Sequence, residues 1–157
     1  MQLFIMRHGE ASYDGKTDAD RPLTEQGKLE AVFMAKWLSS MKVELNQVFT
    51  SPYVRAQQTV NILLTTLQTS VKATVLNFIT PDGSAQHAHD FIDGIGANAD
   101  ESILIVSHMP LVSYLVEELT FERQSPIFQT AGIVEIDYDI EKMKGNFVRL
   151  ICPLDLC

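Results

Sequence analysis

Short apolar runs alternate along this chain with segments of helical periodicity, and this alternation restricts the fold more than any other feature of the sequence. Four apolar runs predict strands, at 2–7, 47–51, 73–78 and 102–107. A segment with apolar residues at helical spacing follows each run, at 25–41, 52–67, 88–95 and 110–120. Strands that alternate with helices in this way form a mostly parallel sheet with helices on both faces.

The pattern changes near the end of the chain. Residues 132–138 and 146–152 alternate apolar with polar side chains, which predicts two strands joined through Lys144, Gly145 and Asn146. We expect them to form an antiparallel hairpin at the edge of the sheet. The expected fold class is therefore α/β, a three-layer α/β/α sandwich with a mostly parallel central sheet. The 157 residues fit a single domain spanning 1–157.

Charge and composition argue against several classes of function. The formal net charge is −8, whereas binding to nucleic acid or to a membrane surface needs a basic face. No apolar run approaches the ~20 residues of a membrane span, and the run from Leu3 to Met6 is too short for a secretion signal. Cys152 and Cys157 fit no zinc-finger or redox motif. We expect a reduced, cytoplasmic protein, a monomer that needs no metal or cofactor.

Basic and titratable side chains stand at three of the predicted strand ends. The first strand ends in Arg7 and His8, and the fourth ends before His108. Ser51 ends the second strand, and Arg55 lies in the first turn of the helix that follows. The carboxyl ends of parallel strands meet at one edge of a sheet, and a helix N-terminus there adds free N–H groups. The sequence therefore predicts an anion site at this edge.

Arginine and histidine in one pocket suit a phosphoryl group. The planar guanidinium matches two phosphate oxygens at once. A neutral histidine ring is a nucleophile that can take the phosphoryl group, and a second, protonated imidazole can stabilise the transferring oxygens. The sequence contains neither a glycine-rich Walker loop nor the clustered carboxylates of a two-metal phosphatase. These residues therefore favour phosphoryl transfer without a metal.

Four stretches carry a resemblance that extends over nearly the whole chain, namely FIMRHGE, DRPLTEQGK, VFTSPYVRAQQT and VSHMPLVSYLVEEL. In this order they resemble the histidine phosphatase (phosphoglycerate mutase-like) superfamily, and most of all its short SixA-type phosphohistidine phosphatases. The resemblance implies that His8 is the nucleophile that becomes phosphorylated. It implies that Arg7, Arg55 and His108 complete the phosphate pocket, and it places Arg21 near the pocket mouth.

Three further residues are candidates for binding phosphate or substrate. Gly9 has no side chain, which lets the backbone turn closely past a phosphate. Ser51 is a candidate phosphate ligand, or a partner that orients an arginine or a histidine. Arg21 either contacts the substrate or forms an ion pair with Asp18 or Asp20.

The expected substrate follows from a missing acid. Mutases and many phosphatases of the superfamily use a carboxylate after the third strand as general acid, and the SixA-type branch lacks a dedicated one. Here Asp82 is the only acid in NFITPDGSAQ, within a Pro-Asp-Gly turn sequence. A sugar alkoxide needs a proton to leave, whereas imidazole, with a solution pKa of ~6.5, leaves readily once protonated. We therefore expect a phosphohistidine on a protein, such as the histidine-phosphotransfer domain of a signalling relay.

Two other functions are compatible with the same residues. One is a small-molecule phosphomonoesterase of this superfamily with Asp82 as its acid, and the other is a non-catalytic phosphate-binding module. His87 and His89 form a pattern that also occurs in metal sites. On a helix, at ~100° per residue, their side chains point about 200° apart, so we expect surface histidines and no metal ligands.

Overall fold

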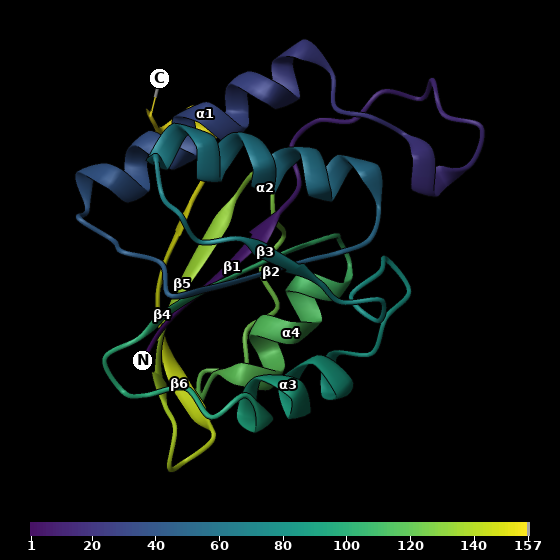
Figure 1. Cartoon of the computed structure of the whole chain (residues 1–157). Coiled ribbons are helices and arrows are strands. Elements are labelled where there is room, and N and C mark those ends of the chain that lie inside the picture. The colour runs from purple at the N-terminus through teal and green to yellow at the C-terminus, as the bar shows by residue number, and fades with distance from the viewer. Residues whose placement is uncertain (157) are drawn as a thin grey trace.

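The computed structural model describes residues 1–156, in which six strands form one sheet and four α-helices cover it (Figure 1). The strands are β1 (Gln2–Arg7), β2 (Gln47–Thr50), β3 (Ala73–Val75), β4 (Ser102–Ser107), β5 (Ile133–Asp139) and β6 (Lys144–Ile151). The helices are α1 (Glu25–Ser40), α2 (Val54–Leu67), α3 (Ala85–Gly94) and α4 (Leu111–Leu119). Two short 3-10 helices complete the list, η1 (Asp18–Asp20) and η2 (Pro153–Leu156).

The sheet is mixed, with the strand order β3-β2-β4-β1-β5-β6. Strands β3, β2, β4 and β1 run parallel to one another. Strand β5 runs antiparallel to β1, and β6 runs antiparallel to β5 at the edge of the sheet. The predictions of a mostly parallel sheet and of an antiparallel hairpin at its edge are confirmed.

Helices α1 and α2 cover one face of the sheet, and α3 and α4 cover the other (Figure 1). Strand β1 shows how the sequence produces these layers. Phe4 and Met6 pack in the cluster that includes α1 and α2, whereas Leu3 and Ile5 pack in the cluster that includes α3 and α4. All four side chains are fully buried. A strand covered on both faces must be apolar at every position, and the predicted three-layer sandwich is confirmed.

The predicted connection between the two strands of the final hairpin is wrong. Lys144, Gly145 and Asn146 lie inside β6, and the chain turns before them. The carboxylate of Asp139 forms this turn by accepting the backbone N–H groups two and three residues further on. A Cβ on Gly145 would collide with the carbonyl oxygen of Asp137 on the neighbouring strand β5. Gly145 therefore permits a close approach between two strands. From the sequence alone, a glycine at this position suggests a turn.

Two element boundaries also differ from the expected ones. Strand β3 ends at Val75 rather than at 78, because the chain leaves the sheet after the N–H of Leu76 bonds to the carbonyl of Thr50 at 2.9 Å. Helix α3 begins directly after Ser84, one turn before Ala88, the first apolar residue of the predicted helical face. The hydroxyl oxygen of Ser84 accepts the N–H of His87 at 3.2 Å and so caps the helix.

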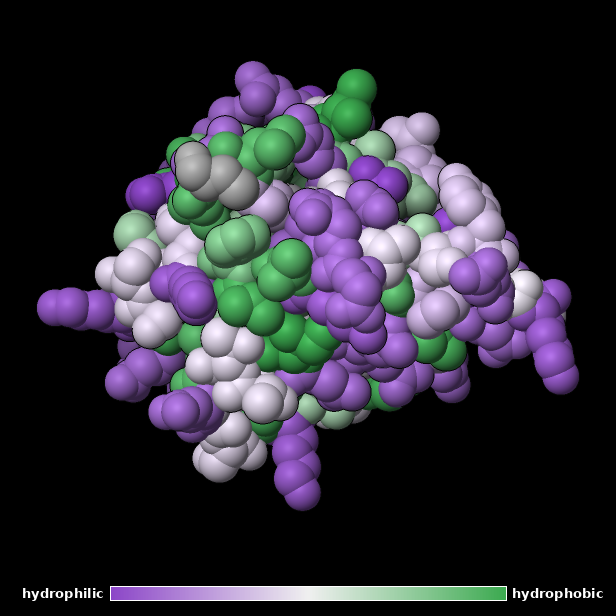
Figure 2. All heavy atoms as spheres, turned by 90° about the horizontal axis from the view of Figure 1, so that it is seen from above, coloured by the Kyte–Doolittle hydropathy of each residue, from purple (hydrophilic) through white to green (hydrophobic). Residues whose placement is uncertain are grey.

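The molecular surface over α1 and α2 is largely hydrophilic, with apolar residues between the polar ones (Figure 2). Leu29 of α1, for example, is 54% exposed. Apolar side chains of this kind are normal on the surface of a globular protein. Among residues 1–156, no helix combines the length and apolarity needed to cross a membrane.

Candidate active site

Three adjacent strand ends hold the candidate site, because β4 lies between β1 and β2 in the sheet. The N–H of His8 bonds to the carbonyl of Ser107 at 3.0 Å, which ties the end of β1 to the end of β4. The N–H of Ser51 bonds to the carbonyl of Val106, also at 3.0 Å, which ties β2 to β4. Side chains that are far apart in the sequence therefore leave the sheet side by side, as expected for parallel strands.

His8 is a buried, neutral histidine. Its Nδ1 lies 2.7 Å from the carbonyl oxygen of Gly9, so Nδ1 carries the proton and donates it. The other ring nitrogen, Nε2, then carries a lone pair and is a hydrogen-bond acceptor. Burial first, and then the charges of the neighbouring Arg55 and Arg7, lower the pKa of His8 from 6.5 to about 4, although the bond to Gly9 acts in the opposite direction. Near neutral pH the ring is therefore uncharged and nucleophilic at Nε2.

Two arginines flank this histidine. Arg55 lies in the first turn of α2, and its Nε donates to Nε2 of His8 at 3.2 Å. Arg7 ends β1, and its Nη1 donates to the carbonyl of Phe128 at 2.8 Å. The Nε of Arg7 is buried and has no partner. A buried N–H without an acceptor is costly, so the geometry of Arg7 suits an anion that supplies one.

His108 follows β4 and lies against His8, with 5.0 Å between the ring centroids. Its Nε2 is 2.7 Å from the hydroxyl of Ser51, which also accepts the N–H of Tyr53 at 3.2 Å. The N–H of Tyr53 takes one of the two acceptor positions of this hydroxyl. We assign the hydroxyl proton of Ser51 to the bond with Nε2 of His108, which leaves the proton of His108 on Nδ1. That Nδ1 is buried and has no partner.

His108 is neutral in the free site, and a protonated imidazole with a phosphoryl group bound stays a prediction. Burial first, then the charges of the neighbouring groups, lower the pKa of His108 from 6.5 to about 2. The ring is 1% exposed, so water cannot stabilise a positive charge on it. His108 therefore contributes a neutral Nδ1–H donor to the pocket. Within residues 1–156, Arg7 Nε and His108 Nδ1 are the buried side-chain nitrogens that lack a partner.

Gly9 and Ser51 have contacts inside the protein that explain their presence. A Cβ on Gly9 would lie 2.6 Å from the carbonyl oxygen of Gly27, so the missing side chain lets the loop pack against α1. The N–H of Gly9 donates to Thr59 of α2 at 3.0 Å. Ser51 is fully buried beneath His108. Direct binding of phosphate by Gly9 or Ser51 stays a prediction.

Asp18 of η1 belongs to the site, although the sequence pointed to it only as a partner of Arg21. Its backbone carbonyl accepts Nη1 of Arg55 at 2.6 Å, and its Oδ2 lies 3.2 Å from Nη2 of Arg55. Its Oδ1 pairs with Nη1 of Arg21 at 3.0 Å. The hydrogen bond from Arg21, followed by that from Arg55, lowers the pKa of the Asp18 carboxyl. The expected ion pair of Arg21 is confirmed, and a contact of Arg21 with substrate stays a prediction.

Asp82 is exposed and accepts the hydroxyl of Thr80 at 2.8 Å, as a turn residue does. His87 is exposed as predicted, and its ring stacks on Phe78 with centroids 4.1 Å apart. Within the part of the chain that the structure describes, no group of three or more His, Cys, Asp or Glu side chains is arranged to hold a metal ion.

The prediction that His89 lies on the surface is wrong. The residue is 7% exposed, and its Nε2 lies 2.9 Å from the carbonyl of Met143 and 3.1 Å from the hydroxyl of Tyr138. Its Nδ1 lies 3.5 Å from Glu118. The helical wheel correctly separates His89 from His87. Three of the four polar partners that bury His89 come from distant segments, and the fourth, Asp93, lies one turn along the same helix, 3.3 Å from Nε2.

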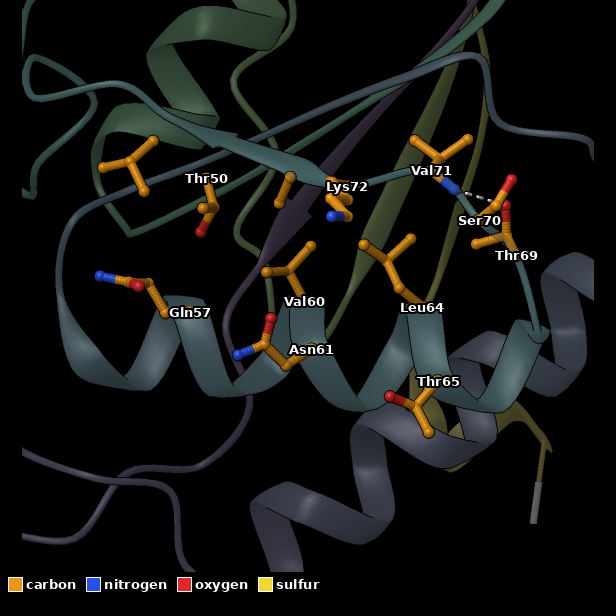
Figure 3. Close-up of a pocket in the computed structure, with 12 residues that line it drawn as sticks. Thr50, Gln57, Val60, Asn61, Leu64, Thr65, Thr69, Ser70, Val71 and Lys72 are labelled. Atoms are coloured by element: carbon orange, nitrogen blue, oxygen red, sulfur yellow. Dashed lines mark hydrogen bonds between the residues drawn. The ribbon is translucent and has the colours of Figure 1, made fainter.

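A hollow of about 660 Å³ lies between α2 and the segment that leads into β3 (Figure 3). Its wall includes Val60 and Leu64 of α2 and Lys72 and Val71 opposite them. None of the four predicted catalytic residues lines it.

Of the two cysteines in the sequence, Cys152 is buried, and Cys157 lies outside the described residues.

Fold and site together define a three-layer α/β protein with arginine donors around a neutral, buried histidine. Comparison with known proteins agrees with this class. The family model described as histidine phosphatase superfamily (branch 1) matches residues 3–75. The phosphohistidine phosphatase SixA of Escherichia coli (strain K12) is 38% identical over 156 residues, which cover 99% of this chain and 96% of that protein.

Two further comparisons point the same way. The SixA homolog of Haemophilus influenzae is 38% identical over 152 residues, covering 90% of this chain and 91% of the relative. The solved structure of the protein histidine phosphatase SixA complexed with tungstate matches with a TM-score of 0.94, 38% identity and full coverage of both chains. The chain belongs to the histidine phosphatase superfamily, and the family resemblance predicted from its motifs is confirmed.

Proposed function

We propose that this protein is a phosphohistidine phosphatase, a hydrolase that removes the phosphoryl group from a histidine of another protein through a covalent phospho-His8 intermediate. One observation carries the proposal. The nucleophilic His8 lies beside two residues that each carry a buried donor without a partner, Arg7 with its Nε and His108 with its Nδ1. A phosphoryl group supplies the oxygens that these donors need. The relatives at 38% identity are named as phosphohistidine phosphatases, which agrees with this reading.

The first step transfers the phosphoryl group to His8. Arg7 and the Nδ1–H of His108 hold its oxygens, and Nε2 of His8 attacks phosphorus from the side opposite the leaving group. Arg55 Nε, which donates to Nε2 of His8 at 3.2 Å, gives up that contact and turns its N–H to the oxygens. The bond between phosphorus and the substrate nitrogen breaks, and its electron pair returns to the substrate ring.

The second step hydrolyses phospho-His8. The proton on Nδ1 of His8 stays in place because it donates to the carbonyl of Gly9 at 2.7 Å. The phosphorylated ring is therefore cationic, and it leaves as a neutral ring when water attacks phosphorus. The protons of that water end on the phosphate product and in solvent. The exposed Asp82 is needed in neither step, which favours an imidazole leaving group over a sugar alkoxide.

The partner that best suits this chemistry is a phosphotransfer domain that carries phosphohistidine. Neither step calls for a metal or a cofactor. We propose that the protein acts in the cytoplasm as a monomer, with Arg21 near the pocket mouth and Gly9 and Ser51 supporting the phosphate site.

Phosphate release from a radiolabelled phosphohistidine protein tests this proposal. The wild type should discharge the protein and form an acid-labile phosphoenzyme, also in the presence of a chelator. His8→Ala should abolish both, and Asp82→Asn should change neither. Detection of no phosphoenzyme with any substrate would instead favour a phosphate-binding module. A preference for sugar phosphates that Asp82→Asn removes would favour a phosphomonoesterase.

A further inference from the structure

The leaving group of the first step must depart from the site in a defined direction. His8 is 7% exposed and lies at the floor, so the group opposite its Nε2 must leave toward solvent. The side chain of Arg55 is 5% exposed, whereas that of its partner Asp18 is 55% exposed. The carboxylate of Asp18 therefore lies on the solvent side of Arg55.

This carboxylate has capacity for another hydrogen bond. A carboxylate offers about four lone-pair positions, and Asp18 uses one on each oxygen for Arg55 and Arg21. The two arginines keep Asp18 ionised, so it cannot give a proton to a leaving group. An ionised carboxylate is, however, a strong acceptor for an N–H.

We propose that Asp18 recognises the protonated imidazole of phosphohistidine by accepting the N–H of the ring nitrogen that does not carry phosphorus. This inference rests on the proposed function and adds a specificity-determining residue to it. The proton stays on that nitrogen while the P–N bond breaks and a bond forms between phosphorus and Nε2 of His8. The electron pair of the broken bond returns to the leaving nitrogen, and the ring departs neutral rather than as an imidazolate anion.

The charges around Asp18 permit a cationic ring there. Arg55 from α2 and Arg21 from its own loop are the charged groups bonded to the carboxylate, and His108 nearby is neutral. The two negative charges of a phosphoryl dianion offset the positive charges of Arg7 and Arg55, and the negative charge of Asp18 offsets that of Arg21. A phosphate ester has no N–H and no positive charge in its leaving group, so it gains nothing from Asp18. The residue therefore favours P–N over P–O substrates.

Replacing Asp18, with Asp20 as the matched control position, distinguishes recognition of the leaving ring from mere support of Arg55. Asp20 lies in the same 3-10 helix but accepts only the hydroxyl of Thr17 among the contacts within residues 1–156. Phosphoimidazole and p-nitrophenyl phosphate serve as probes, because nitrophenolate leaves without a proton. Asp18→Asn should lower kcat/KM for phosphoimidazole about 10- to 100-fold more than for p-nitrophenyl phosphate, the factor of one hydrogen bond to a charged group. Asp20→Asn should change neither value.

The pH profile gives a second readout. Loss of the Asp18 charge should move the alkaline decline of phosphoimidazole turnover to lower pH, because the bound ring then loses its proton more easily. An equal fall for both probes, with an unmoved profile, would overturn the inference and leave the proposed function standing. Failure of the wild type to hydrolyse any phosphohistidine or phosphoimidazole would overturn the proposed function, and the inference with it.

Discussion

The hydroxyl of Ser51 donates to Nε2 of His108 across 2.7 Å, and this hydrogen bond decides which nitrogen of His108 faces the phosphate pocket with a proton. The N–H of Tyr53 occupies one of the two acceptor positions of the same hydroxyl. Ser51 thereby acts on a bound phosphoryl group through His108. Without Ser51, the ring is free to place its proton on Nε2 and to present a bare Nδ1, which repels phosphoryl oxygens.

Ser51→Ala should therefore lower kcat about tenfold, the effect of one net hydrogen bond, with a smaller change in KM. In the double variant Ser51→Ala/His108→Ala, turnover should equal that of His108→Ala alone, because both changes remove the same donor. Thr50→Val is the matched control, since the buried hydroxyl of Thr50 donates to the carbonyl of Ser51 and not to His108. Additive losses in the double variant would contradict this role.

Arg7→Lys should show that geometry matters as well as charge. The Nη1 of Arg7 donates to the carbonyl of Phe128, and its buried Nε, which has no partner, can donate to the phosphoryl group. A lysine keeps the charge but has no planar fork with which to make both contacts. We expect kcat to fall about 10²- to 10³-fold, as for loss of an oxyanion donor.

Arg149→Lys is the control for Arg7→Lys, because Arg149 forms a partly exposed ion pair with Glu135 at 3.2 Å, in the β5–β6 hairpin. Its kcat should stay within about twofold of the wild type, since pairs of this kind contribute little. Steady-state turnover of a phosphohistidine protein measures both variants. Turnover of Arg7→Lys at the wild-type rate would show that the planar guanidinium is dispensable.

The four residues that the sequence brought together were predictable because each stands at a strand end or a few residues after one. Arg7, His8 and His108 follow apolar runs, and Arg55 follows a third run by a few residues. Parallel pairing carries such positions to one edge whatever the details of the loops. Local pattern is sufficient for this part of the site.

Asp18 and His89 were not predictable, for a shared physical reason. Asp18 lies in a loop without periodicity, and it reaches the site through a contact with Arg55, 37 positions away in the chain. Besides Asp93 on its own helix, His89 is buried by polar partners 29 and 54 positions away, Glu118 and Met143. Periodicity reports which residues of one element face the core. It does not report which polar groups of other elements meet them there.

Acid should destabilise the fold through His8 and His108. Their pKa values, about 4 and about 2, lie below the usual 6.5, so between these values the unfolded chain binds protons that the folded chain does not. Stability therefore rises with pH in this window and is lost as the pH falls below 6.5, by up to about 1.4 kcal/mol per pH unit for each histidine.

His108→Gln removes one of these two groups. Urea unfolding at about pH 7 and about pH 5 should show a smaller loss of unfolding free energy in this variant than in the wild type. His87→Gln, at an exposed position, should keep the full loss. An identical fall in His108→Gln and wild type would show that His108 is not a neutral, buried group in the folded protein.

His89 should contribute to stability and not to catalysis. Its ring is buried between the carbonyl of Met143, the hydroxyl of Tyr138 and the carboxylate of Glu118. His89→Ala leaves these groups without their partner, so we expect the free energy of unfolding to fall by about 1–3 kcal/mol. His87→Ala, on the exposed face of the same helix, should cost less than about 1 kcal/mol. Denaturant titration measures both, and phosphatase turnover below the transition should match the wild type in both. A loss of turnover in folded His89→Ala would instead connect this buried cluster to the active site.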